Sequence, residues 1–353
     1  MSPTLLRSSA HHVYRVVRHR RLSPREFRMI TRVAVWVMIL IIVSGAAVRL
    51  TGSGLACPTW PKCTSTSVVA PLAINPWIEF ANRLINAGIG IVAVVAVIGA
   101  LIRVRRRRDL TWLSVGLIGG VLAEIVLGGI TVLDKLAPQL VSAHFVLAMV
   151  FLANAVVLHH RAGMADEDIP RSPGSARPAG LPRLMVSAGQ RRLAQLLVVA
   201  VSVVVVLGTI VTSTGPHGGD PQARRFALNL HDVAQIHGTS AEAFVGLTVI
   251  MVWWLAHSGA PRALLRRGEI LLAVLLAQGI LGYVQYATGV PSGLVEIHIA
   301  GSVAVVVATL DFYLGLTTRA PFPVPADSPP GPSIIPDDAA HGHGSAVGAR
   351  IGS

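Results

Sequence analysis

The chain contains eight apolar runs of about 20 residues, the length that an α-helix needs to cross the hydrocarbon core of a membrane. Charged residues make up only 13% of the chain, whereas roughly 25% is usual in soluble domains. The sequence therefore predicts an all-α integral membrane protein with eight transmembrane helices. The runs occupy residues 31–50, 82–102, 112–133, 140–159, 193–213, 233–256, 268–287 and 294–316.

Part of the sequence occurs twice. Residues 122–144 and 276–298 align without a gap at an offset of 154, and a shorter similarity relates 44–52 to 207–215 at an offset of 163. Each copy would contain four spans, so both copies enter the membrane in the same direction. The repeat predicts two tandem four-helix bundles related by a pseudo-twofold axis along the membrane normal.

Composition divides the chain further. Residues 161–192 are rich in Pro, Ser, Gly and Arg, which predicts a flexible cytoplasmic linker between an N-terminal half, 31–160, and a C-terminal half, 193–317. Residues 1–30 are basic and predict a cytoplasmic arm that contacts membrane lipid. Residues 318–353 are rich in Pro and Gly and predict a disordered cytoplasmic tail.

The net charge of +13 is distributed unevenly. Arginines crowd the segments before the first run and after the second, fourth and sixth, whereas the alternate loops carry only Lys62, Lys135, Arg224 and Arg225. This alternation follows the positive-inside rule and predicts a multi-pass protein of the cell membrane with cytoplasmic N- and C-termini. It argues against nucleic acid as a partner.

Three of the thirteen histidines, His144, His237 and His298, lie inside apolar runs near their outer ends. An imidazole in hydrocarbon is costly unless its nitrogens find partners. A hydrogen bond to a neighbouring helix is one solution. Because His237 and His298 belong to one predicted bundle, they can also face each other and hold a haem iron between them.

The N-terminal half repeats this arrangement incompletely. His144 corresponds to His298, but Asn82 stands where an offset of 155 would place the counterpart of His237. A haem bound by His144 would therefore be five-coordinate or use another ligand.

The stretch from Gly45 to Leu55, followed by Cys57-Pro58, Trp60-Pro61, Cys63, Ile78-Glu79 and Arg83, resembles the haem A synthase family. The resemblance covers nearly all of the eight spans. It implies that the C8 methyl of haem O is oxidised by successive hydroxylation to the formyl of haem A, which is supplied to terminal oxidases.

The same resemblance implies the cofactors and partners. Haem b would bind to His237 and His298, and the substrate haem O would bind to His144 in the N-terminal half. The family usually has histidine where this chain has Asn82. Expected partners are haem O and haem A, a haem O synthase, an electron donor and further copies of the chain.

Glu79 and Arg83 are one helical turn apart and can pair on one face. The pair is either a helix-end salt bridge or, as the resemblance implies, Glu79 is catalytic and steers proton transfer beside the haem. Arg49 and Arg83 can bind haem propionates through the guanidinium fork or anchor the helices at the interface.

Cys57 and Cys63 are the only two cysteines, and they share one predicted outer loop. The charge bias places this loop in an oxidising compartment, so the sequence predicts a disulfide. A metal site would require further ligands.

Glu124 corresponds to Gln278 at the offset of 154. At membrane depth, a hydrogen bond to a neighbouring helix is the expected role for each, and proton relay through Glu124 is the alternative.

Two other functions compete with synthesis of haem A. One is a b-type cytochrome that only relays electrons. The other is a non-catalytic haem-binding assembly protein in which Asn82 marks a lost site.

Overall fold

The computed structural model describes residues 21–164 and 183–318, within which eight long helices account for most of the chain. All eight are long and apolar enough to cross a membrane, which confirms the predicted multi-pass membrane protein. The helices are α2 (Pro24–Leu50), α3 (Ile74–Ile102), α4 (Arg108–Leu133), α5 (Pro138–Ala162), α6 (Ala188–Thr214), α7 (Leu230–His257), α8 (Arg262–Ala287) and α9 (Ser292–Leu314).

Several helices begin before their apolar runs because polar residues cap the first turn. The Ser23 hydroxyl accepts a hydrogen bond from the backbone N–H of Glu26, and the Glu26 carboxylate accepts one from the backbone N–H of Ser23. Ser187 and Gln190 form the same reciprocal pair at the start of α6. Such capping boxes satisfy backbone N–H groups that the helix leaves unpaired. Helix α6 therefore starts within the segment predicted as a linker. Residues 1–20, 165–182 and 319–353, which include most of the predicted arm, linker and tail, lie outside the described residues.

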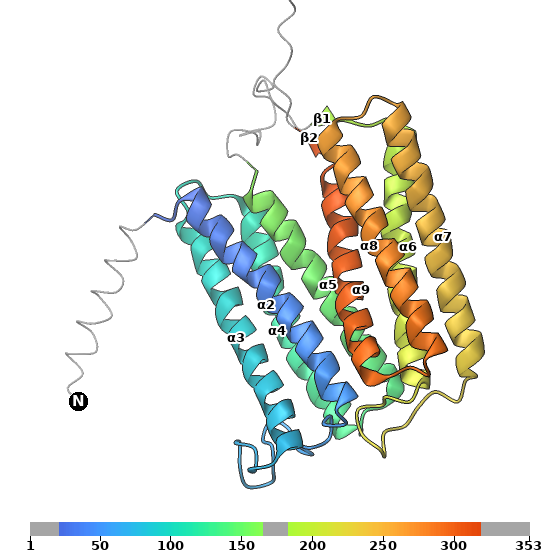
Figure 1. Cartoon of the computed structure of the whole chain (residues 1–353). Helices are drawn as coiled ribbons and strands as arrows, with labels where there is room; N and C mark the ends of the chain where they lie inside the picture. The colour runs from blue at the N-terminus through green and yellow to red at the C-terminus, as the bar shows by residue number, and fades with distance from the viewer. Residues whose placement is uncertain (1–20, 165–182, 319–353) are drawn as a thin grey trace, which may run out of the picture.

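The helices pack as two groups of four (Figure 1). In the first group, α2 packs on α3, α3 on α4, α4 on α5 and α5 on α2, and α6 to α9 close a ring in the same order. Helices α2 and α5 contact α9, and α5 also contacts α6, so one face of each group joins the two. These contacts are those expected of two tandem four-helix bundles.

Two very short strands lie at the end of α9 and before α6. Strand β1 (Arg183–Leu184) pairs antiparallel with β2 (Thr317–Thr318), with Arg183 opposite Thr318. Two residues show no alternating pattern, so sequence periodicity could not reveal these strands. They tie the start of α6 to the end of α9 without changing the all-helical architecture.

Large apolar side chains cover the outside of the helices, including Trp36, Trp112 and Trp253. Glycines bring helices close together inside, as where Gly120 faces the ring of Phe151. Apolar outer faces and small residues at helix contacts are both typical of membrane bundles, because lipid tails provide an apolar solvent and association depends on close packing.

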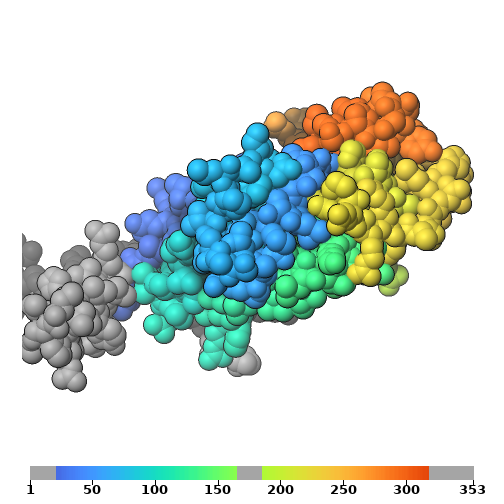
Figure 2. Space-filling model, turned by 90° about the horizontal axis from the view of Figure 1, so that it is seen from below, coloured from blue at the N-terminus to red at the C-terminus, as the bar shows by residue number. Residues whose placement is uncertain are grey.

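The loops 51–73, 134–137, 215–229 and 288–291 all lie at one end of the molecule, called here the disulfide end (Figure 1). Figure 2 looks onto this end and shows the 51–73 loop, in blue, spread over the first bundle, with the 215–229 loop, in yellow, beside it. The opposite end bears most of the arginines that the sequence places between spans.

Candidate functional site

The candidate ligand residues lie at similar depths near the disulfide end. Asn82 is in α3, His144 in α5, His237 in α7 and His298 in α9, each about two turns after its helix begins. Within each ring of four helices, the two helices that carry these residues lie diagonally opposite each other. Each bundle therefore carries two candidate residues on diagonally opposite helices.

His237 and His298 form a facing pair, as the sequence predicted for neighbours in one bundle. Their ring centroids are 6.4 Å apart, and the ring planes are inclined by 73°. A metal ion held by one nitrogen of each ring, with bonds of about 2 Å and ring centres about 1 Å further away, requires a centroid separation of about 6 Å. The spacing of these two imidazoles fits haem iron.

The ring nitrogens of all three histidines are arranged alike. In His144, His237 and His298, Nδ1 is buried and makes no hydrogen bond of normal geometry within 21–164 and 183–318. Buried polar atoms without a partner are uncommon and require a specific explanation. Rings whose Nδ1 is enclosed in the fold would bind a ligand through Nε2.

Each histidine also rests against a glycine of the preceding helix. A Cβ added to Gly128, Gly208 or Gly282 would lie 3.2 Å from Cε1 of His144, His237 or His298, respectively. We call these three positions the seat glycines. A larger side chain would push the ring away from its present position, so the seat glycines set where each imidazole stands.

The sequence comparison aligned Gly128 with Gly282, but only their contact with the histidines reveals what they do. Gly45 occupies the equivalent place beside Asn82, where an added Cβ would lie 3.8 Å from Nδ2. The recurrence of glycine in four helices before the candidate ligands was therefore the signal that could have found the seats from sequence alone.

Asn82 differs from the histidines because its side chain is already paired. Its Nδ2 donates to Oγ of Ser44 at 3.0 Å, and that hydroxyl donates to the Ile41 carbonyl at 3.2 Å. The N-terminal bundle thus contains one imidazole, whose side chain is 38% exposed, and on the diagonally opposite helix an amide that α2 holds in place.

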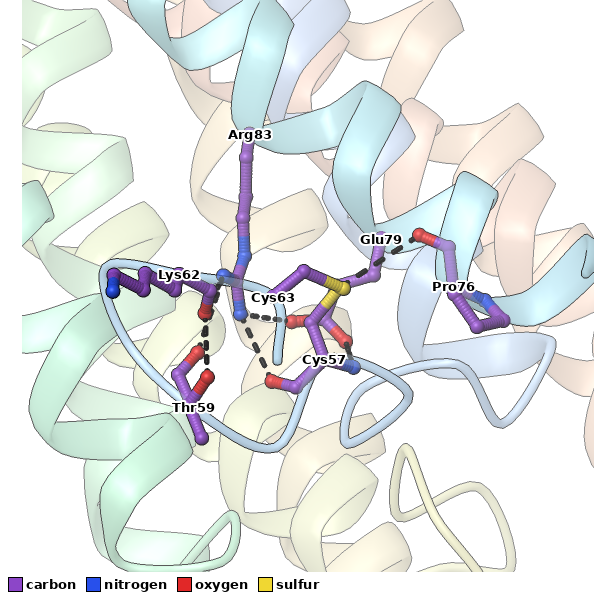
Figure 3. A network of polar contacts seen from close by, with 7 residues as sticks. All are labelled: Cys57, Thr59, Lys62, Cys63, Pro76, Glu79 and Arg83. Carbon is purple, nitrogen blue, oxygen red and sulfur yellow. Dashed lines mark hydrogen bonds and ion pairs between the residues drawn. A yellow bond between two sulfur atoms is a disulfide. The ribbon is translucent and has the colours of Figure 1, made fainter. Parts of the chain in front are cut away.

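Glu79 and Arg83 form the predicted i, i+4 pair, at 2.5 Å, but their main contacts are with the cysteine loop (Figure 3). Glu79 accepts a hydrogen bond from the backbone N–H of Cys57 at 2.7 Å and is only 5% exposed. Arg83 donates to the carbonyls of Cys57, Thr59 and Lys62. The pair is therefore not a solvated helix-end bridge, because it fastens the loop to α3.

The predicted disulfide between Cys57 and Cys63 is present, and both cysteines are fully buried. Trp60, from the middle of this loop, packs against Gly129, where an added Cβ would lie 2.9 Å from its ring. Gly129 is adjacent to the seat glycine Gly128. The disulfide loop consequently covers the end of α4 next to His144.

Arg49 reaches from the first bundle into the second. Its Nε donates to the carbonyl of His217 at 2.7 Å, and Nη2 donates to the carbonyl of Thr212 at 2.8 Å. The guanidinium therefore binds the end of α6 and the loop that follows it. The contact joins the two bundles beside the candidate sites, and sequence reasoning did not foresee it.

Residues 28–310 match a family whose description is cytochrome oxidase assembly protein, COX15-CtaA. A heme A synthase of Geobacillus kaustophilus (strain HTA426) is 32% identical over 148 residues, which cover 40% of this chain and 46% of that protein. A heme A synthase of Alkalihalophilus pseudofirmus is 27% identical over 141 residues, with the same coverage of 40% and 46%.

A third relative, a heme A synthase of Geobacillus thermodenitrificans, is 31% identical over 105 residues, which cover 30% of this chain and 33% of that protein. The chain thus spans about half the length, or less, of these curated relatives. The family match is far longer, since it runs from within α2 to within α9. On that match, this chain belongs to the COX15-CtaA family of cytochrome oxidase assembly proteins.

Proposed function

We propose that this protein is a haem A synthase, which oxidises the C8 methyl of haem O to a formyl group by successive hydroxylation and supplies haem A to terminal oxidases. The facing pair His237 and His298 carries the proposal, because its spacing suits haem iron in a chain of this family. Relatives that bear the name heme A synthase support it.

The C-terminal bundle is the proposed site of haem b. His237 and His298 would ligate the iron, with the seat glycines Gly208 and Gly282 leaving room for their rings. Bound haem b would supply reversible one-electron transfer. The protein's part is to fix two imidazoles at the required separation and to surround them with apolar helices.

The N-terminal bundle is the proposed site of haem O. His144 would bind the substrate iron through Nε2. Asn82 is hydrogen-bonded to Ser44, so it would line the opposite side of the site instead of replacing the histidine as a strong ligand. This arrangement suits a five-coordinate substrate haem.

Glu79 is the proposed catalytic residue, as a carboxylate that steers a proton near the substrate. Glu79 is buried beside the disulfide loop, and a charge with little exposure to bulk water interacts more strongly with nearby charges. This supports a role in steering a proton. Arg83 would hold Glu79 in place.

Arg49 and Arg83 are proposed partners of the haem propionates. Each guanidinium now donates to backbone carbonyls, so a propionate would share or replace those acceptors.

The proposed orientation places the disulfide end outside the cell membrane and both termini in the cytoplasm. The arginine-rich segments at the opposite end support it through the positive-inside rule. In this arrangement the two bundles are related by a pseudo-twofold axis along the membrane normal. A haem O synthase, an electron donor and further copies of this chain are the proposed partners, and nucleic acid is not among them.

The position of the histidines favours synthesis of haem A over electron relay alone. A cytochrome that carries electrons across a membrane requires haems near both faces, whereas His144, His237 and His298 all lie toward one end. A non-catalytic assembly protein would share the haem sites but yield no product.

The experiment is to express the chain with a haem O synthase and a suitable electron donor in a host that lacks haem A, and to identify the extracted haems by mass. We expect haem A or its hydroxylated precursor. Glu79→Ala should abolish the product while haem b remains. If the folded chain carries haem b but yields only haems B and O, the proposed activity is wrong.

A further inference from the structure

Glu124 is a buried carboxylate that the proposed chemistry does not use. It lies on α4, one turn before the seat glycine Gly128, and is 8% exposed. Its Oε2 is 2.9 Å from Nδ1 of His144, and its Oε1 has no hydrogen-bond partner within the described parts of the chain. A carboxylate at membrane depth is costly unless it is paired, so this contact with a candidate iron ligand requires a reason.

The distance between Nδ1 and Oε2 is that of a hydrogen bond, but the angle between the two groups is not. Rotation of the imidazole about χ2 would direct the Nδ1 proton at the carboxylate, and this torsion is a soft one. Within 21–164 and 183–318, Nδ1 of His144 makes no hydrogen bond of normal geometry to any other group. The carboxylate of Glu124 is therefore placed to accept the Nδ1 proton.

The C-terminal bundle has a different arrangement at the same place. Gln278, the counterpart of Glu124, donates from Nε2 to the backbone carbonyl of His298 at 2.7 Å. Its Oε1 lies over Gly301, where an added Cβ would be only 2.0 Å away. Gly301 thus provides the space that lets Gln278 reach the backbone of α9, leaving the ring of His298 without a side-chain acceptor.

In the N-terminal bundle, the residue that corresponds to Gly301 at the offset of 154 is Leu147. Leucine carries a side chain where Gly301 has none, and in this bundle Glu124 contacts the ring of His144. Two changes, Glu for Gln and Leu for Gly, therefore distinguish how the two bundles support their histidines.

We propose that Glu124 is a positioning residue for His144, which accepts a hydrogen bond from Nδ1 and makes Nε2 a more strongly donating ligand than the imidazoles of the C-terminal bundle. The inference rests on the proposed function, since it requires haem in the N-terminal bundle. A carboxylate behind a metal-bound imidazole fixes its tautomer and raises its basicity, and stronger donation stabilises the oxidised iron.

The test uses the full-length protein loaded with haem in both bundles. Glu124→Gln retains the size of the side chain and removes its charge. We expect the iron–imidazole stretching frequency of the N-terminal haem, measured by resonance Raman spectroscopy on the reduced protein, to fall. We also expect the midpoint potential of that haem to rise, while haem b is unchanged. Unaltered frequency and potential would overturn the inference.

Two further variants separate charge from packing. Gln278→Glu is the matched control and should leave the N-terminal haem as it was. Glu124→Asp keeps the charge but shortens the side chain, so it should remain closer to the unmodified protein than Glu124→Gln does. If Glu124 acted only by packing, Glu124→Gln would resemble the unmodified protein more than Glu124→Asp does. Equal loss of haem from Glu124→Gln and Glu124→Asp would also contradict the inference.

The same spectra distinguish the two levels of the proposal. Absence of any N-terminal haem signal in the unmodified protein would overturn the proposed function, and this inference with it. A normal signal that Glu124→Gln does not shift would overturn the role of Glu124 alone.

Discussion

The two four-helix bundles have the same arrangement of helices but differ in the polar side chains that the helices carry. A glycine stands beside the candidate ligand in every case, and the ligand-bearing helices are diagonal in both rings. In the C-terminal bundle, two imidazoles face each other at 6.4 Å. In the N-terminal bundle, an amide paired with Ser44 lies across from one imidazole that contacts Glu124. The two bundles therefore carry different polar groups at corresponding positions.

The loops at the disulfide end differ as well. The loop over the N-terminal bundle is closed by the Cys57–Cys63 disulfide and fastened to α3 by Glu79 and Arg83. The loop after α6 is held mainly by hydrogen bonds to backbone carbonyls, including those from Arg49 of the other bundle. The bundle proposed to bind the substrate thus has its own covalently closed cover.

Removing an imidazole from the C-terminal bundle should have the largest effect. In His298→Ala, the facing pair is lost, and we expect the low-spin haem b signal to disappear from the reduced-minus-oxidised spectrum. His257→Ala is the control, because His257 is exposed and, among the described residues, hydrogen-bonds to the Trp253 carbonyl of its own helix. An unchanged spectrum in His298→Ala would remove the basis for assigning haem b to this bundle.

Adding an imidazole to the N-terminal bundle should make the two bundles alike. Asn82→His replaces the amide that Ser44 holds with a second imidazole diagonally opposite His144. We expect a new six-coordinate, low-spin signal from the N-terminal haem, and a several-fold change in the yield of haem A. Asn82→Ala is the control and should not produce that signal. If Asn82→His matches Asn82→Ala, the two positions do not face a common iron.

Changing a seat glycine should have a smaller, graded effect. In Gly282→Ala the new Cβ would lie 3.2 Å from His298, and such overpacking costs roughly 1–3 kcal/mol. If the strain falls on the bound state, haem b should bind about 10- to 100-fold more weakly. Gly279→Ala, on the same helix with nothing within 4 Å, is the matched control. If Gly282→Ala and Gly279→Ala bound equal amounts of haem b on titration, Gly282 would not set the position of the His298 ring.

Much of the architecture follows from the sequence alone. Eight long apolar runs predict eight membrane helices because a backbone in lipid must satisfy its own hydrogen bonds, and two cysteines in one outer loop predict their bridge. The histidines stand out because apolar spans rarely contain ionisable groups. The direction of the repeat axis and the orientation in the membrane remain predictions.

Only the tertiary structure decided how those residues are used. It placed His237 opposite His298 with inclined rings, turned Arg49 toward carbonyls of the other bundle, and joined Glu79 to the backbone of the disulfide loop. It also brought Glu124 to the ring of His144, while Gln278 reached only the backbone. The physical reason is that periodicity and composition specify which face of a helix is apolar. Which polar atoms meet across helices depends on close packing, and here on the space left by single glycines.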